Sequence, residues 1–589
     1  MKSFRLYHFR TIALLCVLLP LNTWANNASE KLTQLVDEIW QYELQSFPRL
    51  ASRQGITDFD DRLTDISASA LAERTAQFEA YLAALDAIDQ AQLNQSEVTT
   101  LLMQRYRIQN YVDQYHFNQH FVPLTSEYGF HSSLAQIPSQ TRLNTAQDVE
   151  NYLKRLALVG PIIEQNIAWM KEGLKVGMTQ PKVVLNGFEE SVAPLIADEP
   201  HASYFYQPIA SLSEDNFSAA DIDKWQTAAL LLVAEQINPA YQAFYDFLVD
   251  DYIPNAREDI AAVNWPNGAD FYQNRIRYYT TTDLTAAEIH QIGLTEVARI
   301  RAEMQEIVDA LEFDGDINEF IQFLRTDPQF YAKSADELLI YASYVSKKMD
   351  AKLPQLFKKL PRTPYGVAPV PDSIAPKYTT GRYISPSRDD QPGYYWVNTY
   401  ALDKRPLYAI PALTLHEAVP GHHLQISLAN EMEGLLPVRR QTYISAFGEG
   451  WGLYSEFLGV EVGIYADPYD DFGRLSYEMW RACRLVVDTG MHTMGWSRDR
   501  ARAYMLENTA LSEHNVKTEI DRYISWPAQA LSYKIGEIKI KQLRTDAELR
   551  LGENFDLRDF HDALLAQGSV PLYILEQNIE QFIQRNLFE

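Results

Sequence analysis

Cysteine is nearly absent from this sequence, which has only Cys16 and Cys483 among its 589 residues. Cys16 lies in an amino-terminal segment that we expect to be removed on export, so no intramolecular disulfide remains possible. A chain of this length can bury a core large enough to be stable in an oxidising compartment without disulfides. Cys483 lies in an amphipathic stretch, where we expect it to pack as a small buried hydrophobe.

Basic residues are also scarce relative to acidic ones. The chain has 52 Lys and Arg against 78 Asp and Glu, which gives a formal net charge of −26. Nucleic acids and anionic lipid surfaces are bound through positively charged patches, so we expect this chain to bind neither. An acidic surface is typical instead of a soluble, exported protein.

Two further patterns are missing. The motif GxSxG, which carries the nucleophile of many serine hydrolases, does not occur, and this disfavours a serine hydrolase. No repeat with a period of about 20 to 50 residues is evident, which argues against a repeat architecture. With 46% hydrophobic residues, the chain has the composition of a large globular protein with an extensive core.

The amino terminus has the features of a signal peptide. Three basic residues precede the short apolar run TIALLCVLLPL, and Thr23 and Ala25 occupy the small-residue positions of a cleavage site. The run is too short to span a bilayer in the mature protein, and its central cysteine disfavours a lipid attachment site. An uncleaved anchor is the alternative. We expect residues 1–25 to be removed and the mature protein to be periplasmic or secreted, without stable membrane insertion.

The mature chain is mainly helical by its pattern of apolar residues. Between residues 26 and 280, apolar residues recur every three or four positions in segments such as 29–45, 70–88 and 96–117. We expect this amino-terminal region to form one wall of a cleft. Residues 281–589 are expected to form the catalytic region as one continuous structural unit.

The catalytic region changes character along its length. Capping-box signatures at Thr285 and Ser334 predict helices that run to about residues 311 and 350. After Leu360 the chain becomes rich in Pro, Tyr and Gly without a helical period, which favours strands and loops. The best strand is GYYWVNT, residues 393–399, and it lies shortly before the most histidine-rich part of the chain.

Histidine is concentrated in HEAVPGHHLQ, residues 416–425. This segment holds His416, His422 and His423, with Glu417 beside the first, in a chain with only 12 histidines. Two neutral imidazoles can bind one zinc ion, and an adjacent glutamate can act as general base for the water that the metal activates. A helix break with hydrogen-bonded histidines is the alternative, but an acidic helix downstream favours a metal site.

The spacing of these histidines requires an interrupted helix. In the motif HExxH the two histidines are four residues apart and share one helix face. His422 and His423 follow His416 by six and seven residues, so on a straight helix neither could reach the same ion. Pro420 removes a backbone N–H and Gly421 tolerates unusual backbone angles, so the pair predicts a break. We expect His422 to be the ligand because it follows the glycine directly.

A third ligand is expected from the segment AFGEGWGLYSE, residues 446–456. Its two glutamates, Glu449 and Glu456, are seven residues apart and share a helix face. We assign Glu449 to the metal and expect Glu456 to orient a ligand histidine. The predicted site therefore holds one Zn²⁺ per chain, bound by His416, His422 and Glu449.

Three motifs resemble those of a known family. HExxPGHHLQ, EGWxLYxE and PxQALSYKIG resemble the bacterial family called domain of unknown function family 885. More distantly, they resemble gluzincin zinc peptidases of the thimet oligopeptidase, carboxypeptidase Taq and angiotensin-converting enzyme type. The resemblance covers most of the mature chain. It implies a mainly α protein: a large helical, clefted zinc peptidase-like fold with a small antiparallel sheet near the active site.

The resemblance also implies roles for residues other than the metal ligands. In gluzincins an edge strand pairs with the substrate backbone, a role that GYYWVNT would fill with Tyr395 and Asn398. A downstream tyrosine stabilises the oxyanion, which favours Tyr533 in PxQALSYKIG. Arg522 and Tyr523 precede this motif and are expected to contact the substrate.

A further helix is expected near the ligands. Arg484, Asp488 and His492 follow one another by fours along one helix face, so an Asp-paired His492 could donate to the oxyanion or fix Glu449. A plain salt cluster on this helix is the alternative. His423 is expected beside the ligands rather than on the metal.

These assignments predict a metallopeptidase that hydrolyses short peptides. Glu417 would take a proton from the water that zinc activates and deliver it to the leaving amine, while Tyr533 or His492 supports the oxyanion. A cleft would admit oligopeptides and exclude folded proteins, which favours oligopeptidase or carboxy-dipeptidase action. The alternatives are a metal-dependent esterase or amidase of the same fold and an inactive peptide-binding homologue. The sequence carries no signal for an oligomeric state.

Overall fold

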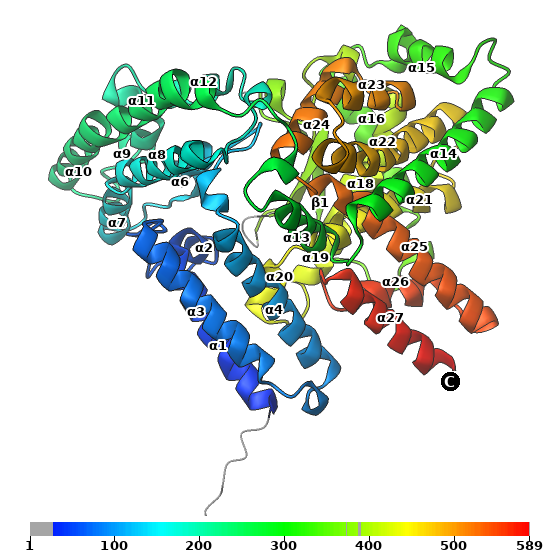
Figure 1. The fold of residues 1–589 in the computed structure, drawn as a ribbon, viewed down its shortest axis with the longest axis horizontal. Helices are drawn as coiled ribbons and strands as arrows, with labels where there is room; N and C mark the ends of the chain where they lie inside the picture. Colours follow the sequence, from blue (N-terminus) through cyan, green and yellow to red (C-terminus); the bar gives the residue numbers. More distant parts are fainter. Residues whose placement is uncertain (1–27, 373, 387–389, 588–589) are drawn as a thin grey trace, which may run out of the picture.

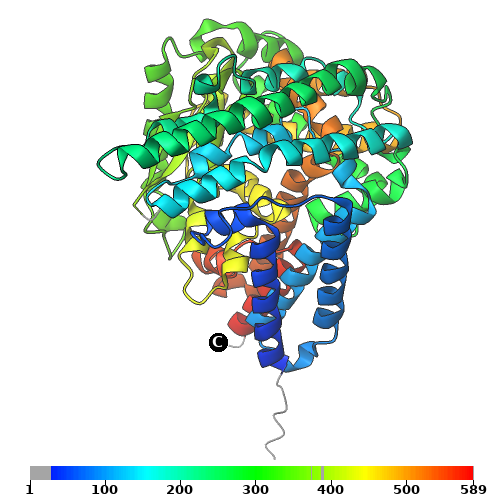
Figure 2. The ribbon, with the colours of Figure 1, turned by 90° about the vertical axis from the view of Figure 1, so that its left-hand side faces the viewer.

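Helices make up most of the structure, as the sequence predicts (Figure 1, Figure 2). The computed structural model describes residues 28–372, 374–386 and 390–587. The signal peptide predicted for residues 1–25 lies outside the described residues. Within the described part of the chain, no helix combines the length and the apolar composition that crossing a bilayer requires.

The first part of the chain forms helices where the apolar periodicity predicts them. Segments 29–45, 70–88 and 96–117 correspond to α1 (Ala28–Ser46), α3 (Ala68–Asp86) and α4 (Gln95–His116). The other longer helices before residue 281 are α7 (Ala146–Leu156), α8 (Val159–Val176), α10 (Ala219–Leu232), α11 (Asn238–Asp246) and α13 (Gly268–Thr280). Helices α7, α8, α10 and α11 lie together on one side of the molecule (Figure 1).

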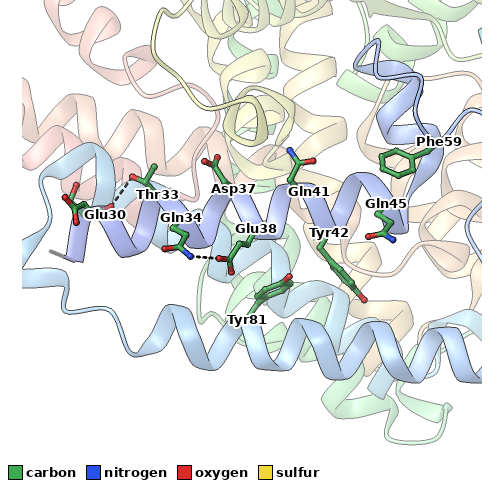
Figure 3. Close-up of a pocket in the computed structure, with 11 residues that line it drawn as sticks. Glu30, Thr33, Gln34, Asp37, Glu38, Gln41, Tyr42, Gln45, Phe59 and Tyr81 are labelled. Atoms are coloured by element: carbon green, nitrogen blue, oxygen red, sulfur yellow. Dashed lines mark hydrogen bonds between the residues drawn. The ribbon is translucent and has the colours of Figure 1, made fainter. Parts of the chain in front are cut away.

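Helix α1 separates its apolar and polar faces cleanly. Leu32, Val36 and Ile39 are buried in a small core with residues of α3 and α4. The opposite face borders a shallow depression with a volume of about 900 Å³ (Figure 3). Its side chains bond within the helix, as Gln34 does to Glu38 at 2.7 Å, so solvation accounts for this face.

The second part of the chain is also mainly helical. Thr285 caps α14 (Ala286–Ala310) and Ser334 caps α16 (Ala335–Asp350), so the helices predicted from these two signatures are confirmed. The other longer helices are α15 (Ile317–Thr326), α18 (Ile410–Glu417), α19 (His422–Asn430), α21 (Ser445–Glu461), α22 (Pro468–Thr493), α23 (Arg498–Asn508), α24 (Glu513–Ser525), α25 (Ser532–Leu551), α26 (Leu557–Leu565) and α27 (Leu572–Leu587).

Helix α22 runs through the interior of this part. Every residue from Phe472 to His492 is buried, including Cys483, which confirms that this thiol packs as a small hydrophobe. Two glycines bring α21 and α25 into close contact nearby. A Cβ atom on Gly450 would lie 2.5 Å from the backbone of Gly536, so a larger residue would force the helices apart. Helix α21 also packs against α18.

The sheet has three strands in the order β1-β3-β2: β1 (Tyr365–Pro369), β3 (Gly393–Val397) and β2 (Gly381–Ile384). Strand β2 is antiparallel to β3, whereas β1 is parallel to it, so the prediction of an antiparallel sheet is wrong for one of the two pairs. The chain after β1 is long enough to cross to the far side of β3 before β2 begins. GYYWVNT does form a strand, but β3 is central rather than an edge.

The packed core is continuous across residue 280. One cluster of buried apolar side chains extends from Leu124 to Ala530, and a second extends from Met103 to Ile583. Side chains of the amino-terminal helices therefore share interior contacts with the helices that follow.

Candidate metal centre

The helix that begins the histidine cluster is interrupted where the sequence predicts. Helix α18 ends at Glu417, and α19 begins at His422 after a turn that contains a cis Val419–Pro420 peptide. A Cβ atom on Gly421 would lie 1.9 Å from the backbone oxygen of His416, so only glycine fits there. The indole N–H of Trp451 on α21 donates to the carbonyl of Pro420 at 2.8 Å and anchors the turn.

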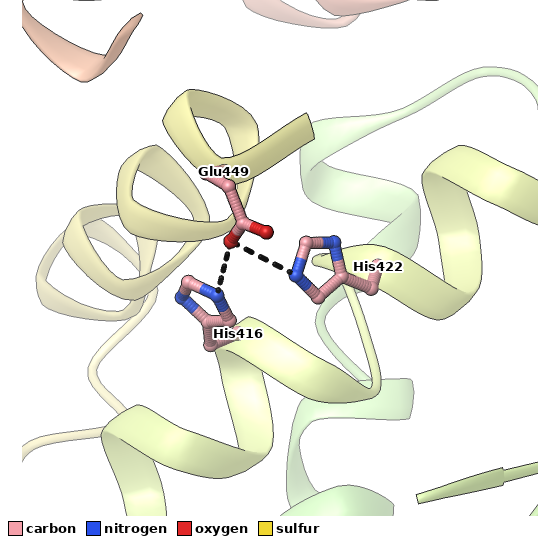
Figure 4. A group of neighbouring side chains, drawn as sticks. All are labelled: His416, His422 and Glu449. Carbon is pink, nitrogen blue, oxygen red and sulfur yellow. Dashed lines mark ion pairs between the residues drawn. The ribbon is translucent and has the colours of Figure 1, made fainter. Parts of the chain in front are cut away.

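The break brings the two predicted histidine ligands to one carboxylate (Figure 4). Nε2 of His416 and Nε2 of His422 each lie 3.5 Å from Oε2 of Glu449, and one donor atom from each of the three residues lies within 4.8 Å of the others. In a tetrahedral zinc site with bonds of about 2.1 Å, two ligand atoms are about 3.4 Å apart. Two imidazoles and one carboxylate are a donor set that suits zinc, which binds three protein ligands in catalytic sites.

The electrostatics of the group favour a cation. Burial would lower the pKa of His416, but hydrogen bonds to Glu449 and Glu456 and the charges of Glu456 and Glu417 outweigh it and raise the pKa to about 10. Burial would raise the pKa of Glu449, yet His422 and His416 hold it well below its usual range. The carboxylates thus stabilise positive charge at the point where the two imidazoles meet.

The His416 ring is held in place from α21. Nδ1 of His416 lies 2.8 Å from Oε1 of Glu456, as predicted for a carboxylate that orients a ligand imidazole. Arg481 lies 3.5 Å from the same oxygen. Gly452 leaves room for the ring, because a Cβ atom there would lie 2.7 Å from it. The remaining oxygen of Glu449 accepts a hydrogen bond from the hydroxyl of Tyr443 at 2.9 Å.

Glu417 and Tyr533 flank the same group. Oε2 of Glu417 accepts a hydrogen bond of 2.7 Å from the backbone N–H of Tyr383 on β2. The half-buried Tyr533, at the start of α25, stacks on the His416 ring with the ring centroids 6.5 Å apart and the planes 21° apart. The guanidinium carbon of Arg484 lies 4.1 Å from the centroid of the tyrosine ring. The group therefore contains two candidate ligand imidazoles, a candidate base and a tyrosine.

Residues 48–579 match the family described as bacterial proteins of unknown function (DUF885). The chain belongs to this family. The family resemblance predicted from the three motifs is thus confirmed, and the match extends well beyond them. Among curated proteins, none matches the chain.

Solved structures share the fold of this DUF885 chain. A crystal structure from Colwellia psychrerythraea, provisionally described as a lipoprotein, is 28% identical with a TM-score of 0.86 and covers 95% of this chain and 100% of its own. A second protein provisionally described as a lipoprotein, of unknown function and from Shewanella oneidensis, is 18% identical with a TM-score of 0.73. That match covers 93% of this chain and 99% of the other, and it shows the fold alone.

The structure separates His423 from the ligand group of the DUF885 chain. Nδ1 of His423 lies 3.0 Å from the hydroxyl of Tyr383, and the ring packs against Tyr365 and Tyr383. Burial lowers its pKa to about 4, so the imidazole is neutral. The geometry therefore distinguishes the two adjacent histidines, with His422 facing Glu449 and His423 supporting the sheet.

The predicted pair of Asp488 and His492 does not form. Nδ1 of His492 accepts from the backbone N–H of Ala262 at 3.1 Å, and Nε2 donates to the carbonyl of Tyr523 at 2.9 Å. Both nitrogens are therefore occupied, and burial lowers the pKa of His492 to about 4. Asp488 accepts instead from the Tyr272 hydroxyl at 2.5 Å. Both residues lie on α22, but their partners come from segments far away in the chain, at residues 262–272 and 523–528, so their expected roles at the candidate metal centre are wrong.

Three of the four predicted substrate contacts are also wrong, because the side chains are buried in the protein. Tyr395 is fully buried beneath the sheet, and the Asn398 amide donates to carbonyls of residues 375, 378 and 379. The Tyr523 hydroxyl donates to Glu519 at 2.5 Å. Arg522 is half-buried and bonds to Gln529 at 2.6 Å.

The sequence interpretation missed Tyr383, Tyr443 and Gly452. The pattern GEGWG in α21 is the one available signal, because glycines that recur within a helix usually mark a close approach. No local pattern distinguishes Tyr383 or Tyr443 among 35 tyrosines.

Proposed function

We propose that this chain is a zinc-dependent metallopeptidase that hydrolyses short peptides, with a gluzincin-like arrangement of the active site. The observation that carries the proposal is the convergence of His416, His422 and Glu449, with Glu417 adjacent to the first histidine and held at the edge of a sheet. A binding site alone would have no need of a carboxylate base at that position.

The chain's own residues account for the proton transfers of hydrolysis. Bound zinc would supply Lewis-acid chemistry, which polarises the scissile carbonyl and activates a water. Glu417 takes one proton from the attacking water as its oxygen bonds to the carbonyl carbon. When the C–N bond breaks, Glu417 returns this proton to the amine nitrogen. The ring of Tyr533 packs beside the His416 ring, and we propose that its hydroxyl donates to the oxyanion.

Strand β2 takes the substrate-pairing role that was expected of β3. Among the described strands β2 pairs only with β3, so its other edge has no strand partner. The backbone N–H of Tyr383 points outward from this edge and donates to Glu417. An extended peptide added to β2 would therefore pass the proposed base.

A recess around the site is part of the proposal, and it would favour short, unfolded substrates. Tyr443 is 45% exposed, yet burial is the main cause that raises its pKa well above the usual range. Tyr128, from the amino-terminal region, is 44% exposed and has its pKa raised chiefly by burial as well. Side chains that are both wetted and surrounded by protein stand in a concave surface, which a folded protein would enter poorly.

The site of action is proposed to be outside the cytoplasm. The signal-peptide pattern of residues 1–25 supports export, and the relative from Colwellia psychrerythraea is provisionally described as a lipoprotein. The acidic net charge of −26 is consistent with a substrate that is neither nucleic acid nor membrane.

Metal analysis combined with one substitution tests the proposal. We expect about one zinc per chain and hydrolysis of a mixed peptide library, and Glu417→Gln should lower the rate by at least about 100-fold with zinc retained. Glu433→Gln, an exposed glutamate outside the group, is the matched control and should act as the unchanged protein does. Unchanged hydrolysis in Glu417→Gln, or turnover of an ester panel without any peptide cleavage, would contradict the proposal.

A further inference from the structure

One arginine close to the proposed base has no carboxylate partner among the residues that the structure describes. Arg382 precedes Tyr383 on β2 and lies opposite Trp396 of β3. Side chains alternate along a strand, so Arg382 projects from the face opposite to Tyr383. The side chain is exposed, and its guanidinium carbon lies 5.5 Å from the centroid of the Tyr378 ring.

Arg382 forms no ion pair with any residue that the structure describes. Across residues 28–372, 374–386 and 390–587, no carboxylate oxygen lies within 4.0 Å of its guanidinium nitrogens. The two other arginines nearby share one carboxylate partner, because Glu519 lies 3.0 Å from Arg484 and 3.5 Å from Arg522. An exposed guanidinium without a carboxylate among the described residues can bind an anionic part of a ligand.

The surroundings of Arg382 favour its charged form. Burial would lower its pKa, but Tyr378, Glu417 and Tyr533 outweigh this and raise the pKa. The guanidinium therefore lies within the field of both the proposed base and the proposed oxyanion donor. Burial raises the pKa of Glu127, although the charges of Arg522 and Arg382 lower it. Among the described residues Glu127 forms no ion pair with either arginine.

We propose that Arg382 binds the free carboxylate at the carboxyl terminus of the peptide substrate, so that the chain releases residues from that end. This inference rests on the proposed peptidase function and specifies its substrate. A guanidinium binds a carboxylate through two parallel hydrogen bonds, a recognition that an amidated or extended peptide cannot offer. The chain would then act as a carboxypeptidase or carboxy-dipeptidase rather than as an endopeptidase.

The direction of the sheet edge agrees with this assignment. The backbone N–H of Tyr383 points away from β3, to Glu417. Bonding directions alternate along a strand, so the backbone groups of Gly381 also point to the edge of β2 that has no strand partner. A peptide that adds antiparallel to β2 runs from Ile384 toward Gly381. The part after the scissile bond, which ends in the carboxylate, would therefore lie alongside the residues that precede Tyr383, and Arg382 is the first of them.

Binding to an inactive protein tests the inference directly. In the Glu417→Gln background, calorimetry compares one peptide as the free acid and as the carboxyl-terminal amide. We expect the acid to bind about 10- to 100-fold more tightly. Arg382→Gln should remove this difference, Arg382→Lys should restore part of it, and Arg53→Gln, an exposed arginine on a distant helix, should leave it intact. Equal zinc content and equal circular dichroism show that each variant is folded.

The outcomes separate this inference from the proposed function. Equal affinity for acid and amide, or a preference that survives Arg382→Gln, would overturn the carboxylate site even if Glu417 proves essential for hydrolysis. Product analysis gives a second decision, since cleavage at internal bonds at the same rate in acid and amide peptides would also overturn it. A preference for the acid that depends on Arg382, without any peptide hydrolysis, would instead support the carboxylate site and contradict the peptidase function.

Discussion

At the scale of single residues, the two adjacent histidines of the cluster have opposite environments. His422 faces the carboxylate of Glu449 and the ring of His416, whereas His423 is neutral and bonded to Tyr383. Chemical identity therefore says little about which imidazole binds a metal. The turn that precedes the pair, by fixing the direction of the first residue of α19, decides it.

Substitution of each histidine should give different results. We expect His422→Ala to lose stoichiometric zinc, because one of three protein ligands is removed. His423→Ala should keep about one zinc per chain and lose some thermal stability, because a buried ring and its hydrogen bond to Tyr383 are deleted. Metal analysis after dialysis and a thermal melt measure both effects. Loss of zinc in His423→Ala alone would reverse the assignment.

The raised pKa of His416 predicts how pH affects the metal-free protein. A histidine whose pKa rises from 6.5 to about 10 on folding contributes stability that is complete below about pH 6.5 and is lost as the pH rises through 10. The melting temperature of the metal-free protein should therefore fall between about pH 7 and 10. The melting temperature of the zinc-loaded protein should fall less over the same pH range, because the metal ion takes the place of the proton. Parallel pH profiles for the two forms would contradict this.

At the scale of elements, the break between α18 and α19 depends on one glycine. Gly421→Ala would place a methyl group 1.9 Å from the His416 carbonyl oxygen, so the turn must open. We expect a loss of about 1–3 kcal/mol of stability together with weaker zinc binding. Gly160→Ala in α8, where the nearest atom would lie 3.4 Å away, is the control and should be neutral or slightly stabilising. Denaturant unfolding and zinc titration measure both variants.

Local signals predicted the elements, and long-range pairing accounts for the failures. The helix break was predictable because Pro420 and Gly421 lie between the histidines. The shared face of Glu449 and Glu456 on α21 was predictable because seven residues span about two helical turns. The position of β3 in the sheet depends on where the chain crosses after β1, which no local pattern encodes. The partners of His492 are likewise contributed by a remote segment.

At the scale of the whole molecule, residue 280 divides the sequence but not the interior. Gln180 donates to the carbonyl of Ser525 at 2.9 Å, and Tyr272 bonds to the buried Asp488. Both large clusters of buried apolar residues include side chains from each side of this position. The amino-terminal helices thus stabilise the part of the chain that holds the candidate metal ligands.

Expression of residues 281–589 alone should therefore fail to give a stable protein. We expect this fragment to lack a cooperative thermal transition, since it exposes apolar surface that is buried in the whole chain. Co-expression with residues 26–280 should restore both the transition and zinc binding. A fragment that melts cooperatively and binds zinc by itself would show that the shared core is dispensable.

The interruption between α18 and α19 also changes what a metal ion would do mechanically. In a regular HExxH helix the helix itself fixes the distance between the two histidines, so a bound ion adds no constraint between them. Here His416 and His422 belong to separate helices, α18 and α19, joined by a short turn. An ion bound to both histidines would cross-link the two helices. The angle between α18 and α19, and with it the orientation of Glu417 toward a substrate, would then depend on whether the ion is bound.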